Sequence, residues 1–181
     1  MNLMSDAMEP LGEMPEFAQL LTAFKNPILA VIVGALFTGI IQSSAASVAI
    51  LQALSLTGSV TYGMAIPIIM GQNIGTCVTA LISSIGVNKN AKRVSVVHIT
   101  FNMAGTITVL IIYFVAQIFF PLEFLVDPID QVGIAACHSV FNIFTTALIF
   151  PFQKYLVRFA ETAIKDNGKA EKQEVTFIDE R

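Results

Sequence analysis

The sequence predicts an all-α membrane protein with a re-entrant helical hairpin and three transmembrane helices, one of them broken. Of its 181 residues, 55% are apolar and 13% charged, whereas soluble domains carry about 25% charged residues. No Asp, Glu, Lys or Arg occurs in residues 26–88, 94–122 or 131–153. A bilayer excludes charges from such stretches, whereas a soluble fold needs them on the outer face of every element. The first stretch also contains two polar clusters, which indicate a site within the membrane.

Composition and motifs argue against several functional classes. A net charge of −3 without a basic stripe argues against a nucleic-acid partner. We find no Ser/His/Asp constellation, paired carboxylates or P-loop, so the sequence does not predict an enzyme. Cys77 and Cys137 lie in apolar stretches without CxxC spacing, which favours packed thiols over a disulfide or redox role.

Residues 1–25 are predicted to form an interfacial amphipathic segment. Apolar side chains recur there at helical spacing beside charged ones: Phe17, Leu20, Leu21 and Phe24 beside Glu13, Glu16 and Lys25. Such a helix lies in the plane of the membrane interface.

Residues 27–56 are predicted to form the re-entrant hairpin. The apolar run Pro27–Ile41 would be about 22 Å long as a helix, shorter than a hydrocarbon core of about 30 Å. It meets the polar run Gln42–Ser47, and a second short apolar run, Val48–Leu56, follows. Irregular backbone at this depth is tolerated only where protein or a watery cavity surrounds it.

Three spans are predicted at residues 60–86, 94–120 and 132–151, within a transmembrane domain of residues 26–153. The first contains Gly71-Gln72-Asn73-Ile74-Gly75-Thr76, which predicts a broken or unwound helix; a GxxxG packing face is the alternative. Residues 88–93 are expected to be a polar loop and residues 121–130 an acidic loop. Pro151 is expected to end the last span, and the charged linker 154–181 to begin as an amphipathic helix.

Basic residues predict the orientation. Lys89, Lys92 and Arg93 lie in one loop, whereas the acidic loop contains no Lys or Arg. The positive-inside rule places the basic loop and the C-terminal tail in the cytoplasm. The hairpin then opens outward, and nothing carries the start of the chain across the membrane. We therefore expect the chain to be part of a longer multi-pass protein of the cytoplasmic membrane.

The pattern H-x-x-F-N occurs twice, at residues 98–102 and 138–142. The two copies are predicted on antiparallel helices, near opposite membrane faces, where they could not share a metal ion. Asn102 and Asn142 are expected to form interhelical hydrogen bonds.

The two polar clusters suit an anion and a cation. Hydroxyl and backbone N–H groups at a helix break can donate to a tetrahedral oxyanion. Carbonyl and hydroxyl oxygens of residues 72–76 could bind Na⁺. For Ser43 and Ser44 the alternative is hydrogen bonding to the preceding helical turn.

These motifs resemble the type II sodium-dependent phosphate cotransporters, in their bacterial branch. The resemblance rests on Asn26-Pro27, Gly34, Thr38, Gln42-Ser43-Ser44, Gly71–Thr76 and the H-x-x-F-N pattern. It implies one half of a carrier with two inverted repeats, each with a QSSS hairpin, and a site between the hairpins. The implied phosphate ligands are Gln42, Ser43 and Ser44; the implied sodium ligands are Gln42, Ser43, Ser47, Gln72, Asn73 and Thr76.

Two departures from the family pattern shape the expected function. Ala45 replaces the third serine, and only one QSS hairpin is present, whose topology fits the second repeat. We expect sodium-coupled phosphate transport that needs the first repeat, with Na⁺ as coupling ion and no other cofactor. Residues 174–181 resemble the lead into a PhoU-like domain. The alternative is a membrane scaffold or regulatory subunit that recruits a PhoU-like partner and transports nothing.

Overall fold

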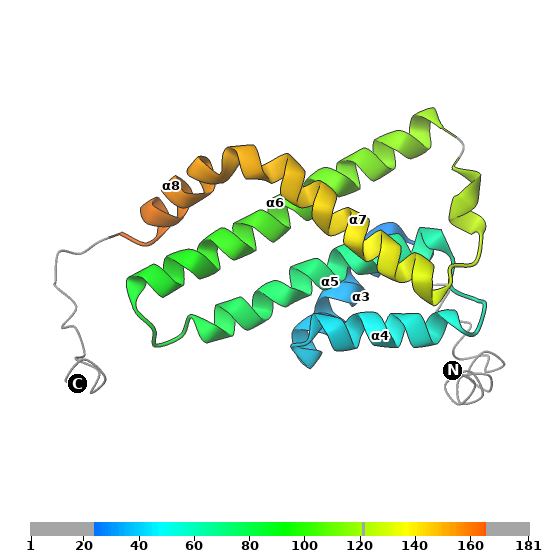
Figure 1. Ribbon diagram of the computed structural model, residues 1–181, viewed down its shortest axis with the longest axis horizontal. Coiled ribbons are helices and arrows are strands. Elements are labelled where there is room, and N and C mark those ends of the chain that lie inside the picture. Colours follow the sequence, from blue (N-terminus) through cyan, green and yellow to red (C-terminus); the bar gives the residue numbers. More distant parts are fainter. Residues whose placement is uncertain (1–23, 121, 166–181) are drawn as a thin grey trace.

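The computed structural model describes residues 24–120 and 122–165, and these form a helical bundle (Figure 1). Its elements are α3 (Pro27–Ile41), α4 (Ser44–Ser55), α5 (Tyr62–Ser83), α6 (Lys89–Phe119), η1 (Glu123–Val126), α7 (Gln131–Ile149), η2 (Phe150–Phe152) and α8 (Gln153–Ala163). Within the described ranges, β structure is limited to one isolated bridge, between Thr61 and Pro128. The predicted all-α class is therefore confirmed.

The hairpin α3–α4 forms where the sequence predicts it. Asn26 caps α3 by accepting hydrogen bonds from the N–H groups of Ile28 and Leu29, and a proline at the first helical position suits this cap. At the tip, Gln42 ends α3 with a left-handed φ of 58°. Ser43 then caps α4, its Oγ accepting from the N–H of Ala46 at 3.2 Å. Both helices are apolar and shorter than the three that could span a membrane.

α5 is an unbroken helix, so the predicted break at Gly71–Gly75 is wrong. The glycines let the backbones of α3 and α5 touch. A Cβ at Gly71 would collide with the carbonyl of Val31, and one at Gly75 with the carbonyl of Ala35. Gly34 on α3 meets the carbonyl of Ile68 in the same way. The small residues therefore form a close packing face, as in GxxxG contacts between membrane helices.

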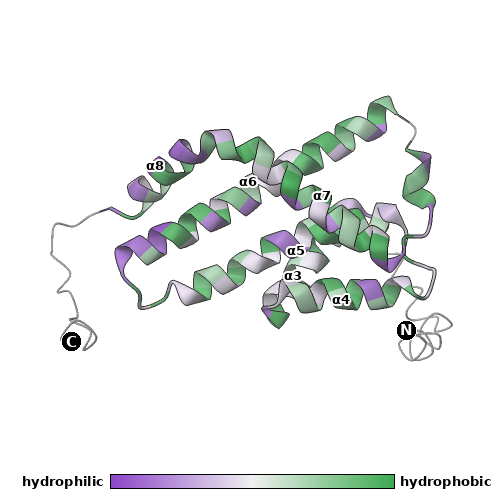
Figure 2. Ribbon diagram, viewed as in Figure 1, coloured by the Kyte–Doolittle hydropathy of each residue, from purple (hydrophilic) through white to green (hydrophobic). Residues whose placement is uncertain are grey.

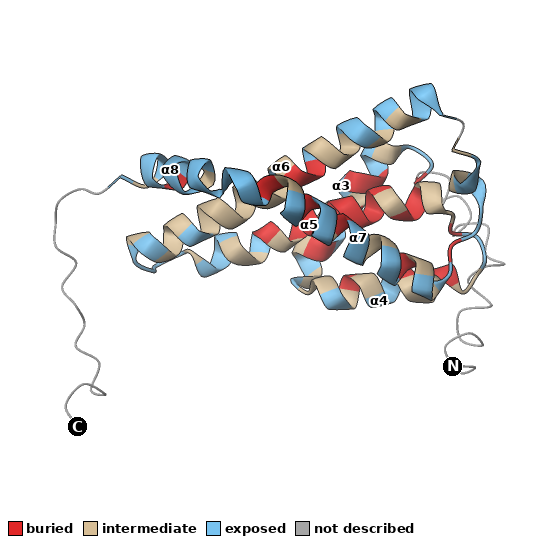
Figure 3. Cartoon of the chain, turned by 45° about the horizontal axis from the view of Figure 1, so that its top comes forward, coloured by how far each residue is buried: buried red, intermediate tan, exposed pale blue. Residues whose placement is uncertain are grey.

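α5 is the central span and the other two are peripheral. Over their most apolar stretches, 56% of α5 is buried, against 11% of α6 and 22% of the α7–α8 segment (Figure 3). α6 and α7 are largely hydrophobic (Figure 2), and their exposed apolar side chains include Ile111, Ile118, Val140 and Ile143. These surfaces suit contact with lipid or with other apolar protein.

α6 starts earlier than the sequence predicts. Asn88 caps it by accepting from the N–H of Ala91 at 2.9 Å, so residues 89–93 form the first turn of a 31-residue helix. The expected polar loop at 88–93 is therefore wrong beyond its first residue. A polar N-cap residue is a strong helix start, and here it places the basic residues on the helix.

The open end of the hairpin and the acidic segment lie at the same end of the bundle (Figure 1). The N–H of Tyr62 donates to the carbonyl of Asp127 at 3.1 Å, and that of Ile129 to the carbonyl of Val60 at 2.9 Å. The main core surrounds this junction and contains Phe24, Ala30, Leu51, Val60, Met64, Ala65, Ile68, Ile69, Ile129 and Ile134. The predicted orientation places the open end of the hairpin and the acidic segment on the same side of the membrane, so it requires that both lie at one end of the bundle.

At the opposite end, α8 lies beside the start of α6 (Figure 1). The chain bends through the 3₁₀ turn η2 at Pro151 and continues as α8. The guanidinium of Arg93 donates to the carbonyl of Ile164 at 3.0 and 3.2 Å. The predicted helix after Pro151 is confirmed, and it lies on the side of the basic residues. The predicted interfacial helix falls outside the described residues except for Phe24 and Lys25, and residues 174–181 lie outside them entirely.

Candidate functional site

A polar pocket lies where the hairpin tip meets α5, α6 and α7. Its volume is about 350 Å³ and its lining residues are Ser44, Gln72, Asn73, Thr76, His98, Phe101, Asn102, His138 and Asn142. Phe101 is the one apolar side chain in this lining, and Asp, Glu, Lys and Arg are absent from it. Polar side chains gathered between apolar helices are costly unless a ligand or water satisfies them.

α5 contributes Gln72, Asn73 and Thr76 to this lining. Gln72 is 2% exposed, and its Oε1 has no hydrogen-bond partner among the described residues. Asn73 is 8% exposed, and its Nδ2 donates to the carbonyl of Ile69 at 3.3 Å. The Thr76 hydroxyl donates to the carbonyl of Gln72 at 2.9 Å. Because these donors point to the helix backbone, the amide and hydroxyl oxygens remain available as acceptors for a cation.

The hairpin tip presents the N-terminus of α4. Ser44 is its first residue and lines the pocket. The first N–H groups of a helix have no acceptor within the helix, and the helix dipole is positive at this end. Ser43 satisfies the N–H of Ala46, rather than bonding back to the preceding turn. The tip can therefore donate to an anion.

The other predicted site residues lie outside the pocket. Gln42 is exposed at the tip, and the Ser43 side chain is the α4 cap. Ser47 is fully buried, and its Oγ is 2.7 Å from Oγ1 of Thr38. Ser47 lines an apolar pocket between the hairpin arms that also reaches Gln72. Ser44, Gln72, Asn73 and Thr76 thus line the polar pocket together, whereas Gln42, Ser43 and Ser47 do not line it.

The two H-x-x-F-N segments meet at this pocket, contrary to their expected placement near opposite membrane faces. Asn102 is the fourteenth of 31 residues in α6, and Asn142 the twelfth of 19 in α7. Both segments are therefore near the middle of their helices, because α6 begins at Lys89. From the sequence alone these residues are expected only to pack; the repeat of the motif is the signal that points to a site.

The expected interhelical hydrogen bonds of the two asparagines are also wrong. The Nδ2 of Asn102 donates to the carbonyl of His98 at 3.0 Å, and that of Asn142 to the carbonyl of His138 at 2.8 Å. Both bonds stay within one helix. They bind the asparagine to the histidine one turn before it on the same face.

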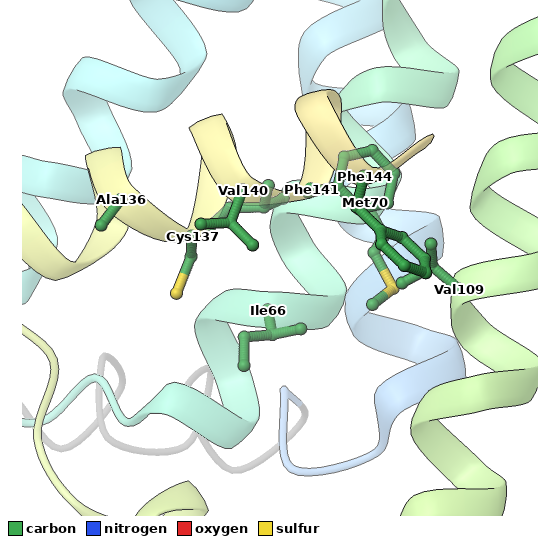
Figure 4. A pocket seen from close by; sticks show the side chains of 9 residues that line it. Ile66, Met70, Val109, Ala136, Cys137, Val140, Phe141 and Phe144 are labelled. Atoms are coloured by element: carbon green, nitrogen blue, oxygen red, sulfur yellow. The ribbon is translucent and has the colours of Figure 1, made fainter. Parts of the chain in front are cut away.

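A neighbouring pocket of about 300 Å³ between α5, α6 and α7 is apolar (Figure 4). Its lining includes Ile66, Met70, Phe141 and Phe144, and the Cys137 thiol is its one weakly polar group. Cys77 and Cys137 are both free. This pocket offers no ligands for an ion, so the candidate site is the polar pocket.

Comparison with known proteins identifies the family of the chain. Residues 1–127 match the family described as Na⁺/Pi-cotransporter. The chain is 30% identical over 135 residues to "Uncharacterized protein YqeW" of Bacillus subtilis, covering 75% of this chain and 43% of that protein. It is 25% identical over 147 residues to "Putative inorganic phosphate export protein YjbB" of Escherichia coli, covering 81% of this chain and 26% of that protein.

A mammalian relative is similar too. The chain is 30% identical over 136 residues to "Sodium-dependent phosphate transport protein 2B" of Pongo abelii, covering 71% of this chain and 18% of that protein. The chain spans less than half the length of each of these relatives. No solved structure matches it. The family match covers most of the chain and agrees with its three apolar helices, so this membrane protein belongs to the Na⁺/Pi-cotransporter family.

Proposed function

We propose that the chain is one repeat of a sodium-coupled phosphate transporter and that the polar pocket is its part of the substrate site. The observation that carries this proposal is the pocket at the hairpin tip, which joins anion donors and cation acceptors without a fixed charge. Membership of the Na⁺/Pi-cotransporter family supports phosphate and sodium as its ligands.

Phosphate would bind at the N-terminus of α4. Ser44 and the free N–H groups of the first turn are the donors from this chain. Gln42 is exposed beside them at a depth where an uncovered polar group costs several kcal/mol in lipid. A second repeat facing the tip would cover Gln42 and Ser43 and bring both into a shared site. A second copy of this chain fits less well, because the basic and acidic ends favour one orientation.

Sodium would bind on the α5 side. The Oε1 of Gln72 is buried without a partner, and Asn73 and Thr76 lie on the same wall. Ser47 would join them if the hairpin shifted, since it already lies beside Gln72 in the adjoining pocket. Coupling follows from charge, because Na⁺ near the anion raises phosphate affinity in a site of low dielectric constant.

The proposed setting is the cytoplasmic membrane, with the tail in the cytoplasm. Arg93 and α8 at one end, and the acidic segment at the other, support this orientation. A PhoU-like partner for the tail remains part of the proposal. The net direction of phosphate transport would follow from the Na⁺ and phosphate gradients. The Escherichia coli relative is named "Putative inorganic phosphate export protein YjbB".

The test is flux in proteoliposomes that contain the full-length carrier to which this chain belongs. We expect an inward Na⁺ gradient to drive uptake of labelled phosphate above the level with K⁺, and an outward gradient to drive release. Uptake that is equal with both cations would contradict sodium coupling. Complete absence of phosphate flux would favour the scaffold alternative.

A further inference from the structure

Two imidazoles line the polar pocket together with Ser44 from the hairpin tip and the polar residues of α5. His98 comes from α6 and His138 from α7, each with the Asn one turn later in the same lining. The remaining lining side chains are hydroxyls, amides and one phenyl ring. The two histidines are therefore the pocket side chains that can carry positive charge, and either can donate an N–H when neutral.

Each histidine is held by its own motif. Asn142 donates to the His138 carbonyl, and its Nδ2 also lies 3.4 Å from His138 Nε2. An amide nitrogen can only donate, so this contact favours the tautomer with the proton on Nδ1. Asn102 makes the corresponding bond to the His98 carbonyl at 3.0 Å. The asparagine thus fixes the turn that carries each ring.

A metal site explains these residues less well. A structural or catalytic metal centre takes three or four protein ligands of the His, Cys or carboxylate type, whereas this pocket supplies two histidines. Within the described residues, no group of three or more such side chains could hold a metal ion. An anion, in contrast, needs N–H donors and positive charge where water is excluded.

We propose that His98 and His138 contact the transported oxyanion from the side opposite the N-terminus of α4. Phosphate would then be held between donors from the hairpin and donors from α6 and α7, while Gln72, Asn73 and Thr76 serve sodium. This inference rests on the proposed function. It divides the pocket into an anion wall and a cation wall.

The test measures phosphate and Na⁺ affinity separately on the purified full-length carrier. The variants are His98→Phe and His138→Phe, which remove the N–H donor, with His98→Gln and His138→Gln as second substitutions that keep one. The matched controls are Ser95→Ala on α6 and Ser139→Ala on α7, neighbouring polar residues outside the pocket lining. Labelled phosphate binding at saturating Na⁺ gives one affinity, and Na⁺-dependent thermal stabilisation without phosphate gives the other.

We expect each His→Phe variant to bind phosphate about tenfold more weakly, the loss typical of a hydrogen bond to a charged group, and the His→Gln variants to recover part of this loss. Na⁺ affinity without phosphate should stay at the unsubstituted level, which a general folding defect would not allow. Unchanged phosphate affinity in both His→Phe variants, or equal losses for phosphate and Na⁺, would overturn the inference. An unsubstituted carrier that binds Na⁺ but no phosphate would instead overturn the proposed function and, with it, this assignment.

Discussion

At the scale of single residues, one hydroxyl pair joins the two arms of the hairpin. Thr38 on α3 and Ser47 on α4 are both fully buried, with their oxygens 2.7 Å apart. Thr38 also lies against α5, since a Cβ at Gly75 would come within 2.7 Å of its Cβ. This pair therefore positions the start of α4, and with it Ser44, relative to the central span.

Thr38→Val tests this role with little change in side-chain volume. The substitution leaves the Ser47 hydroxyl buried without its partner, which costs about 1–3 kcal/mol. We expect a lower melting temperature in detergent, and recovery with Thr38→Ser. The double variant Thr38→Val/Ser47→Ala should lose less than the sum of the two single variants, because the contact is shared. Strict additivity would show that the pair contributes no coupling.

At the scale of elements, α3 and α5 form one unit because their backbones touch. The contact uses Gly34 on α3 and Gly71 and Gly75 on α5, where a Cβ would meet main-chain atoms that cannot move aside. α4 is held at its start by the hydroxyl pair and near its far end by Gln52, which donates to the carbonyl of Gln131 at 2.9 Å.

Gly71→Ala should separate α3 from α5. The added methyl group meets the carbonyl of Val31 and the N–H of Ala35, and overpacking of this kind costs about 1–3 kcal/mol. Gly39→Ala is the matched control, because its nearest neighbour is the movable Val78 side chain at 3.1 Å. Thermal unfolding of both variants is the measurement. Equal melting temperatures for Gly71→Ala and Gly39→Ala would show that the contact between α3 and α5 at Gly71 does not stabilise the bundle.

The hairpin could be predicted from the sequence because its signals are local. A capping Asn26 before Pro27, a short apolar run and a polar tip at Gln42 indicate two short helices and the turn between them. The break predicted at Gly71–Gly75 failed because glycine pairs indicate unwinding and close helix packing equally well. Only the close contact between α3 and α5 shows that these glycines serve helix packing and not unwinding.

The histidine side of the pocket could not be placed from local patterns. The position of His98 and Asn102 along α6 depends on where that helix begins. Asn88 is expected in a loop from the sequence, but in the structure it is the N-cap of α6. The resulting shift moves Asn102 to the middle of α6. Whether His98 and His138 line the same pocket depends on how α6 and α7 cross. The sequence pattern of a single helix carries no information about that crossing.

At the scale of the whole molecule, the polar pocket lies between two surfaces of different character. One side is the packed α3–α5 unit with its core, and the other is the largely exposed α6 and α7. The hairpin tip lies between the two ends of the bundle (Figure 1), and Gln42 is exposed there. This arrangement suits a site completed by a second repeat. The central claim for this chain is that the polar pocket is its part of the substrate site.

The most direct test of that claim is substrate protection at the tip. In a full-length carrier with Cys77 and Cys137 replaced by Ala, S44C introduces a thiol into the pocket lining and S83C one at the far, exposed end of α5. Modification by a small thiol reagent is followed with and without phosphate at saturating Na⁺. We predict that phosphate slows modification of S44C and leaves S83C unchanged. Equal rates with and without phosphate, in an S44C carrier that still binds labelled phosphate, would contradict the proposal that this pocket binds the transported anion.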